Sequence, residues 1–313
     1  MSLTKADNYM KRDIEHILND GYLDENPRPH YSDGTPAHTI SVNQVVRTYD
    51  LSKGEFPICT LRPMAWKTAI KEIFTIYQNP TNEISEMEKM GVNWWKPWDI
   101  GDGTIGQRYG ATVKRYDLIN NLIKDIKSDP YGRRKIVSLW QETDLHETKG
   151  LAPCAFLTMW NVRGEYLDMT LVQRSGDMIT ASGAGGMNEI QYAALLMMIA
   201  RHTGYKAGVF CHFTQNEQIY DRHVDATKEM LNRFEQNQDT IYPNGIAFYY
   251  PPKSIDEMIE IQNKEIEEQR ENIIIPQLIL NPNKTNFYDM TIDDFELKNY
   301  EPIKPQMKLD LGI

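Results

Sequence analysis

Cys154 and Arg174 are the two residues whose types and spacing most clearly indicate chemistry. Cys154 precedes a segment that reads as a strand, and Arg174 follows the next expected strand. Adjacent antiparallel strands bring such ends together, so we expect the two side chains to be neighbours. A nearby cation lowers the pKa of a thiol and favours the nucleophilic thiolate. The alternative role for a free cysteine is that of a small buried hydrophobic residue.

A second basic feature is the pair Arg133-Arg134, which follows the turn sequence Asp129-Pro130-Tyr131-Gly132. Two adjacent guanidinium groups offer planar forks of N–H donors that suit a phosphate group. The alternative is a pair of surface arginines without a ligand. The spacing alone leaves both interpretations open.

One α+β domain spanning residues 1–313 is expected to position these residues. Strands and helices are mixed without strict βαβ alternation, which favours α+β over a doubly wound sheet. Residues 189–203 are apolar nearly all round and therefore predict a buried central helix. Other helices are predicted near 8–19, 66–78, 116–127, from after 218 to about 236, and 254–272, and strands near 39–49, 135–140, 155–162 and 166–173.

Composition excludes several classes of protein. The 44 acidic residues outnumber the 34 basic ones and give a net charge of -10, so a general nucleic-acid-binding surface is not expected. No apolar run is long enough to span a bilayer and the first residues are charged, which predicts a cytoplasmic protein with no membrane partner. The three cysteines lack the spacing of a zinc cluster, and no metal is expected.

Several short motifs occur in a defined order along nearly the whole chain. They are Arg133-Arg134, Ala152-Pro153-Cys154, Gln173-Arg174-Ser175-x-Asp177, Asn188-x-x-x-Tyr192 and Ile219-Tyr220-x-x-His223. Each motif is weak alone, but the ordered set resembles the thymidylate synthase family. The resemblance implies that family's α+β fold, a large mixed or antiparallel sheet packed by helices, with dimers formed through the sheet.

The resemblance also implies a methyltransferase that converts dUMP to dTMP. The family uses 5,10-methylenetetrahydrofolate as cosubstrate, the donor of both carbon and hydride, and needs no metal. Cys154 would add to C6 of uracil, because C5 becomes nucleophilic only after such an addition. Arg174 of the same subunit, with Arg133 and Arg134 of its partner, would bind the phosphate. The expected assembly is therefore a homodimer with shared active sites.

Further residues take their expected roles from the same resemblance. Asn188 would read uracil, because its amide can accept from N3–H and donate to O4; the alternative is a cap on the following helix. Glu72 would move protons through ordered waters; the alternative is an exposed helix glutamate. Tyr109 would lie near the C5 proton, Ser175 at the phosphate, Gln218 and Tyr220 at the ribose, and Asp177, Trp95, Trp98 and Ile313 around the folate.

Some stretches depart from the family pattern. The glycine-rich segment between Asp177 and Asn188 is longer than expected, and its glycines predict a flexible loop. Gln218 stands where a histidine is expected, preceded by Asn216-Glu217 in place of Gly-Asp. Lys96-Pro97 replaces an acidic pair, the stretch 237–275 is long and charged, and Arg28 is the one candidate for a phosphate-binding arginine near the amino terminus.

Two alternative functions remain open at this point. A nucleotide hydroxymethylase of the same fold, acting on dUMP or dCMP, would also use Cys154 but would deliver water instead of hydride. A catalytically degenerate nucleotide-binding homologue would keep the fold alone. The presence of Cys154, Glu72 and Asn188 together argues against the second, since pure binding has no use for the thiol.

Overall fold

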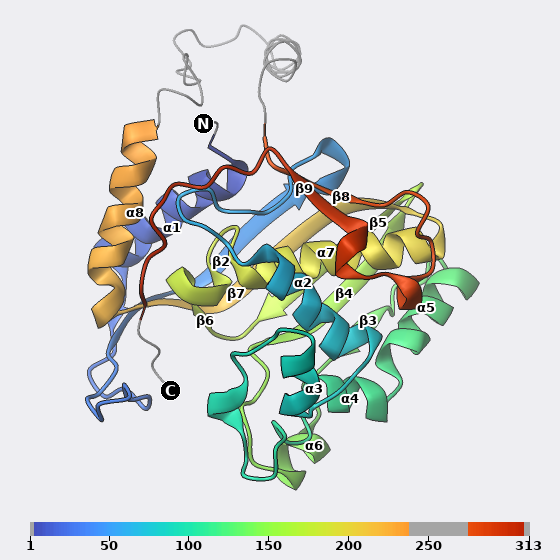
Figure 1. Cartoon of the computed structure of the whole chain (residues 1–313), viewed down its shortest axis with the longest axis horizontal. Helices are drawn as coiled ribbons and strands as arrows, with labels where there is room; N and C mark the ends of the chain where they lie inside the picture. The colour runs from blue at the N-terminus through green and yellow to red at the C-terminus, as the bar shows by residue number, and fades with distance from the viewer. Residues whose placement is uncertain (1–2, 238–274, 310–313) are drawn as a thin grey trace, which may run out of the picture.

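The computed structural model describes residues 3–237 and 275–309 (Figure 1). It shows a mixed sheet with helices packed on it, so the predicted α+β class is confirmed. The predicted helix at 254–272 and Ile313 lie outside the described residues. No helix in the described ranges combines the length and the apolar character that crossing a membrane would need.

The main sheet runs in the order β1-β2-β7-β5-β4-β3, and β6 also pairs with β7. Strands β5 and β7 are parallel, as are β6 and β7, whereas the other neighbours are antiparallel. A separate pair, β8 and β9, is antiparallel. The strands are β1 (Tyr22–Leu23), β2 (Thr39–Asp50), β3 (Ile136–Ser138), β4 (Ala155–Arg163), β5 (Tyr166–Gln173), β6 (Gly176–Asp177), β7 (Lys206–Tyr220), β8 (Gln277–Leu280) and β9 (Phe295–Lys298).

Predicted helices correspond to α1, α2, α5, α7 and α8, whereas α3, α4 and α6 were not predicted. The predicted helix at 66–78 is α-helical only to Ile73 and continues as a π-helical turn over Phe74–Gln78. The helices are α1 (Lys5–Asp20), α2 (Trp66–Ile73), α3 (Ile84–Lys89), α4 (Gly110–Arg115), α5 (Leu118–Ser128), α6 (Glu142–Glu147), α7 (Met187–Thr203) and α8 (Val224–Asn237). As predicted, α7 is central: it lies against α2 and β7 (Figure 1) and is buried on nearly all sides.

The longest strand, β7, was not predicted from the sequence. The expectation of a helix directly after Gln218 is wrong, because the strand continues to Tyr220 and α8 begins at Val224. Several inward positions of β7 are polar and buried, including His212, Thr214 and Glu217. The alternation of apolar and polar residues that marks a strand is therefore absent there.

The glycine-rich segment before α7 is closely packed, which corrects the prediction of a flexible loop. Residues 178–182 form a π-helical turn, and residues 183–186 are buried. Gly185 has a φ of +65°, and a Cβ atom there would lie 2.2 Å from the backbone nitrogen of Cys59. Glycine is needed at this position because only a residue without a side chain permits both the backbone conformation and the close approach.

We predict that Gly185→Ala lowers the free energy of unfolding by about 3 kcal/mol, because left-handed strain and a steric clash add together. Gly204→Ala is the matched control. Gly204 has a φ of +85°, but a Cβ there would have no neighbour within 4 Å, so only the strain of about 1 kcal/mol is expected. Urea unfolding of both variants provides the measurement. Equal losses of the free energy of unfolding in the two variants would contradict the close packing at Gly185.

Candidate active site

Cys154 and Arg174 lie side by side at the open end of the β4–β5 hairpin. Ala155 pairs with Gln173, so the next residue outward on each strand faces the other. The backbone N–H of Arg174 donates to the carbonyl of Cys154 at 3.0 Å, and Nη2 of Arg174 is 3.4 Å from Sγ of Cys154. The predicted contact between thiol and guanidinium is confirmed.

Hydrogen bonds to the preceding loop fix the guanidinium of Arg174 in this position. Nε donates to the carbonyl of Pro153 at 2.9 Å, and Nη2 donates to that of Ala152 at 2.8 Å. Burial raises the pKa of the Cys154 thiol, while the charges of Arg174 and then Arg28 act to lower it. The two cations therefore offset part of the cost of forming a thiolate in this partly buried place.

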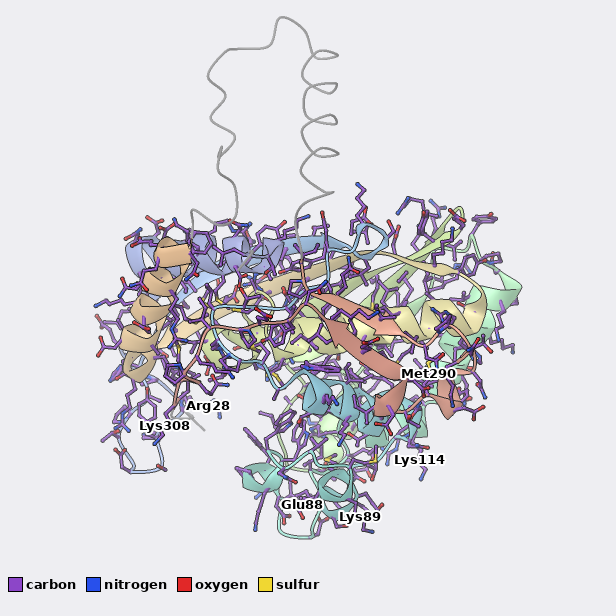
Figure 2. The ribbon with its side chains drawn as sticks, turned by 45° about the horizontal axis from the view of Figure 1, so that its top comes forward. Arg28, Glu88, Lys89, Lys114, Met290 and Lys308 are labelled. Atoms are coloured by element: carbon purple, nitrogen blue, oxygen red, sulfur yellow. The ribbon has the colours of Figure 1, made fainter. Side chains whose placement is uncertain are left out.

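The charge of Arg28, from a distant part of the chain, also acts on the site. It lies between Pro27 and Pro29 on the loop that joins β1 to β2, below α8 in the view of Figure 2. Its charge acts on Cys154 and also on Tyr220. The sequence marked Arg28 only as a weak candidate, and the fold of this loop places it where its charge acts on the thiol.

Glu72 is a buried carboxylate surrounded by hydrogen-bond donors. The indole nitrogens of Trp94 and Trp95 donate to its Oε1, the first at 2.7 Å, and Nε2 of Gln191 donates to its Oε2. The alternative of an exposed helix glutamate is therefore wrong. Burial raises the pKa of Glu72 to about 7, against the effect of these three hydrogen bonds. The group can hold or release a proton near neutral pH.

Asn188 lies in the first turn of α7 and is joined to two glutamines. Nε2 of Gln173 donates to its Oδ1 at 3.2 Å, and its own Nδ2 donates to Oε1 of Gln191 at 2.9 Å. The cap residue of α7 is Gly186, so the alternative role of Asn188 as a helix cap is wrong. Gln191 was not selected from the sequence, although its position three residues after Asn188 places both on one helix face.

Three aromatic side chains continue the site beyond Cys154. The ring centroids of Trp95 and Tyr109 are 4.9 Å apart, and those of Trp95 and Trp98 are 5.8 Å apart. The backbone N–H of Cys154 donates to the Tyr109 hydroxyl at 3.4 Å. Tyr109 has a φ of +48°, a strained value for a tyrosine that surrounding packing must maintain. Such strain is frequent at functional sites.

The remaining predicted contacts gather at β6 and the end of β7. Asp177 pairs with Gln218 across these strands, and the hydroxyl of Ser175 donates to Oε1 of Gln218 at 3.4 Å. Tyr220 packs against the rings of Tyr31 and His223. Burial raises the pKa of Tyr220 to about 12, so its hydroxyl stays protonated and able to donate at neutral pH.

Arg133 and Arg134 are not brought to this site within the chain. Both are exposed on the connection between α5 and β3, and neither forms a hydrogen bond or ion pair with another described residue. Ile313, predicted to close over the folate, lies outside the described residues. No group of three or more His, Cys, Asp or Glu side chains within 3–237 and 275–309 is placed to hold a metal ion.

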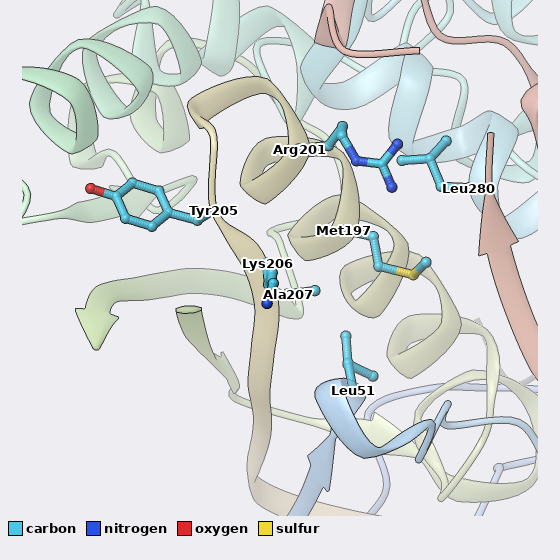
Figure 3. Close-up of a pocket in the computed structure, with 7 residues that line it drawn as sticks. All are labelled: Leu51, Met197, Arg201, Tyr205, Lys206, Ala207 and Leu280. Atoms are coloured by element: carbon cyan, nitrogen blue, oxygen red, sulfur yellow. The ribbon is translucent and has the colours of Figure 1, made fainter. Parts of the chain in front are cut away.

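A pocket at the carboxyl-terminal end of α7 is separate from Cys154 and its neighbours (Figure 3). Met197 and Arg201 of this pocket are at least nine residues beyond Asn188 on the same helix, a rise of about 13 Å or more. The pocket therefore does not belong to the candidate active site. It is lined by Leu51, Met197, Arg201, Tyr205, Lys206, Ala207 and Leu280.

Comparison with known proteins identifies the family. Residues 7–248 match the family model described as thymidylate synthase. The chain belongs to the thymidylate synthase family. Thymidylate synthases of Lactococcus lactis subsp. cremoris (strain SK11) and Streptococcus pneumoniae (strain 70585) are each 44% identical over 318 residues, covering 99% of this chain and 100% of theirs. Thermostable thymidylate synthase A from Bacillus subtilis matches in structure with a TM-score of 0.77 and 31% identity, covering 98% of this chain and 99% of its own. The predicted family and fold are confirmed.

We predict that Arg174→Gln slows alkylation of Cys154 by iodoacetamide several-fold at mildly alkaline pH, because the nearest cation no longer favours the thiolate. Mass spectrometry of the peptide that contains Cys154 measures the rate. Arg28→Gln serves as the comparison and should slow alkylation less, because Arg28 has the smaller effect on the thiol. An unchanged rate in Arg174→Gln would contradict the pairing.

A second prediction concerns the pH dependence of stability. The pKa of Glu72 is raised from near 4.5 to about 7 by folding, so its protonated form stabilises the folded chain and this stability is lost as pH rises through about 7. Wild type should lose about 2–3 kcal/mol relative to Glu72→Gln between pH values of about 5 and about 8. Urea unfolding at several pH values measures this. Glu217, whose pKa is also about 7, is present in both proteins and cancels.

Proposed function

We propose that Cys154 adds to C6 of the uracil ring of dUMP, in the methylation of dUMP to dTMP that the thymidylate synthase family catalyses. The contact between Sγ of Cys154 and the guanidinium of Arg174 is the observation that carries this proposal. The addition converts the ring to an enolate whose C5 can attack a one-carbon unit. A thiol on which the charge of Arg28 also acts can form the adduct while both cations bind the nucleotide's phosphate.

The phosphate site is proposed to be completed by groups around Arg174. Its Nη1 makes no hydrogen bond with another described residue and is available to a phosphate oxygen. Ser175 adds a hydroxyl directly beside it, and Gln218 and Tyr220 would contact the ribose. Five N–H donors in a planar fork let Arg174 bind phosphate while it keeps its contact with the thiol.

Asn188 and Glu72 are proposed to act on the pyrimidine ring. Asn188 would accept from N3–H and donate to O4, the pattern of uracil and the reverse of that of cytosine. Glu72, with a pKa of about 7, would deliver and remove protons at O4 and C5 through water. Tyr109, whose hydroxyl lies beside the backbone of Cys154, would contact the region of the C5 proton.

The cosubstrate is proposed to be 5,10-methylenetetrahydrofolate, which supplies a one-carbon unit and a hydride. Residues around the site fit a pterin ring: Trp95 and Trp98 offer aromatic surface, and the half-buried carboxylate of Asp177 can accept from ring N–H groups. These side chains would orient the folate and exclude water from the reaction. Ile313 stays a prediction as the residue that closes the site.

A homodimer formed through the sheet is part of the proposal. One face of the sheet carries half-exposed or exposed apolar side chains, and no described helix covers them: Val46, Leu157, Met159, Val172, Val209 and Phe213. A patch of this kind on a sheet suits a protein interface. The exposed Arg133 and Arg134 would then bind phosphate in the partner's site. The single domain over 1–313 and the cytoplasmic location stay predictions.

The alternative functions receive less support. The longer glycine segment is the departure from the family pattern that would favour a hydroxymethylase, but this segment packs against Cys59 and forms no loose loop. A degenerate binding protein would have no need for the contact of Cys154 with Arg174 or for a buried Glu72. Methyl transfer with reduction by the folate is therefore the reaction that the site supports best.

The purified chain, given dUMP and methylenetetrahydrofolate, should form dTMP and dihydrofolate together. Cys154→Ala should abolish the release of tritium from C5-labelled dUMP, because C5 exchanges only after the thiol has added to C6. Cys59→Ala is the control, since this cysteine is free and buried away from the site, and it should keep the activity. Hydroxymethyl-dUMP with tetrahydrofolate would instead identify the hydroxymethylase, and tritium release by Cys154→Ala would remove the thiol from the mechanism.

A further inference from the structure

A continuous chain of side-chain hydrogen bonds crosses the interior from His212 to Glu72. Nε2 of His212 is 3.1 Å from Oε1 of Gln173, and Nε2 of Gln173 donates to Oδ1 of Asn188 at 3.2 Å. Nδ2 of Asn188 donates to Oε1 of Gln191 at 2.9 Å, and Nε2 of Gln191 donates to Glu72. The chain links β7, β5, α7 and α2, and Asn188 is its middle member.

Beyond His212, a buried carboxylate continues the network. Glu189, fully buried, receives the Tyr49 hydroxyl and the backbone N–H of Gly185, both at 2.7 Å, and Arg47 at 3.3 Å. Nδ1 of His212 lies 3.0 Å from Oε1 of Glu189. Burial raises the pKa of Glu189, but the hydrogen bond from His212 and the charge of Arg47 outweigh it and lower the pKa. A proton therefore lies between Nδ1 and Oε1.

Burial lowers the pKa of His212, whereas its hydrogen bond with Glu189 and the charge of Glu189 act to raise it. The contacts of Gln173 indicate that the other ring nitrogen of His212, Nε2, carries a proton. Nε2 of Gln173 donates to the backbone carbonyl of Ser175 at 3.0 Å, and a carbonyl oxygen can only accept, so the amide of Gln173 has a fixed orientation. Its Oε1 then faces Nε2 of His212, with the hydroxyl of Thr214 at 3.2 Å from the same nitrogen. Two acceptors would repel each other at this distance. Whichever atom holds the proton shared with Glu189, Nε2 is a donor.

We propose that His212 is a positioning residue that, together with the carbonyl of Ser175, holds the direction of this amide chain and so the hydrogen-bonding pattern that Asn188 presents to the pyrimidine. Each amide has one acceptor oxygen and one donor nitrogen, so a donor at His212 turns every oxygen in the chain toward it. Asn188 keeps a lone pair on Oδ1 and a hydrogen on Nδ2 for the base. Reversal of the chain would exchange these atoms and present the pattern that suits cytosine.

In its ionised form, Glu72 imposes the same direction from the opposite end. Its Oε1 accepts from the indole groups of Trp94 and Trp95, which can only donate, and its Oε2 accepts from Gln191. The donor at His212 and the acceptor at Glu72 therefore favour the same orientation of every amide between them. Neither His212 nor Glu189 contacts the proposed ligand positions. The inference rests on the proposed function, because it assigns the base selectivity of that same site to a buried residue.

The test uses two variants of the full chain that separate the hydrogen bond from the shape of the ring. His212→Phe keeps a flat ring next to Phe210, on which His212 stacks, but removes the N–H donors. His212→Gln loses the ring and keeps an N–H group that reaches Gln173. The dissociation constant for dCMP divided by that for dUMP should fall about tenfold in His212→Phe. A tenfold change corresponds to the free energy of about one buried hydrogen bond. This ratio should stay near its wild-type value in His212→Gln.

Phe210→Leu is the matched control, because it alters packing on the same buried face of β7 and leaves the donor in place. Its ratio should equal that of the wild type. An unchanged ratio in His212→Phe, or an equal fall in Phe210→Leu, would overturn the inference. A wild type that does not prefer dUMP would instead count against the proposed function, which separates the two failures.

A measurement on the wild type keeps the test valid if His212→Phe does not fold. With 15N-labelled histidine, the NMR signal of Nε2 of His212 is the one that is missing from His212→Gln. We expect a directly bonded proton on this nitrogen in the wild type, as seen from its one-bond N–H coupling. An Nε2 without a directly bonded proton would overturn the inference, whatever the activity of the enzyme.

Discussion

The register between β4 and β5 is the constraint on which the rest of the site depends. With Ala155 opposite Gln173, Cys154 and Arg174 leave their strands side by side, and the guanidinium then binds the loop carbonyls that precede the cysteine. A slip of one residue would turn each of these side chains to the other face of the sheet. Backbone pairing of β4 with β5 therefore places the cation beside the thiol. Such pairing within a sheet is far more rigid than a loop.

The interior behind this hairpin contains an unusual set of polar groups. Glu72, Glu189 and His212 are buried, and such groups are costly unless every donor and acceptor is paired. Helix α7 resolves much of this cost, because it supplies Asn188, Gln191 and Glu189 within its first turns. Once paired, these side chains hold each other in one arrangement. The buried polar interior and the base-reading residue therefore form a single connected structure.

Several features could be read from the sequence, and their reasons are local. The hairpin of β4 and β5, the buried helix α7 and the helix that carries Glu72 each follow from patterns within about twenty residues. Strand β7 could not be read in this way, since its buried polar residues erase the alternation that identifies a strand. The prediction of a flexible glycine loop was wrong for a similar reason. Glycine usually indicates a flexible backbone, but at Gly185 it is required by close packing against Cys59.

The sequence by itself determined the family, the class of fold, and the meeting of Cys154 with Arg174, because order of motifs and hairpin pairing are properties of neighbouring residues. Tertiary structure alone decided that the charge of Arg28 acts on the thiol, that Trp94 and Gln191 bind Glu72, and that the amides form a chain. Gln191 and Glu72 are separated by 119 residues, and no pattern of spacing reports such a contact. Directional hydrogen bonds between distant segments exist only once the sheet and helices have packed, since a buried polar group must find its partner in space.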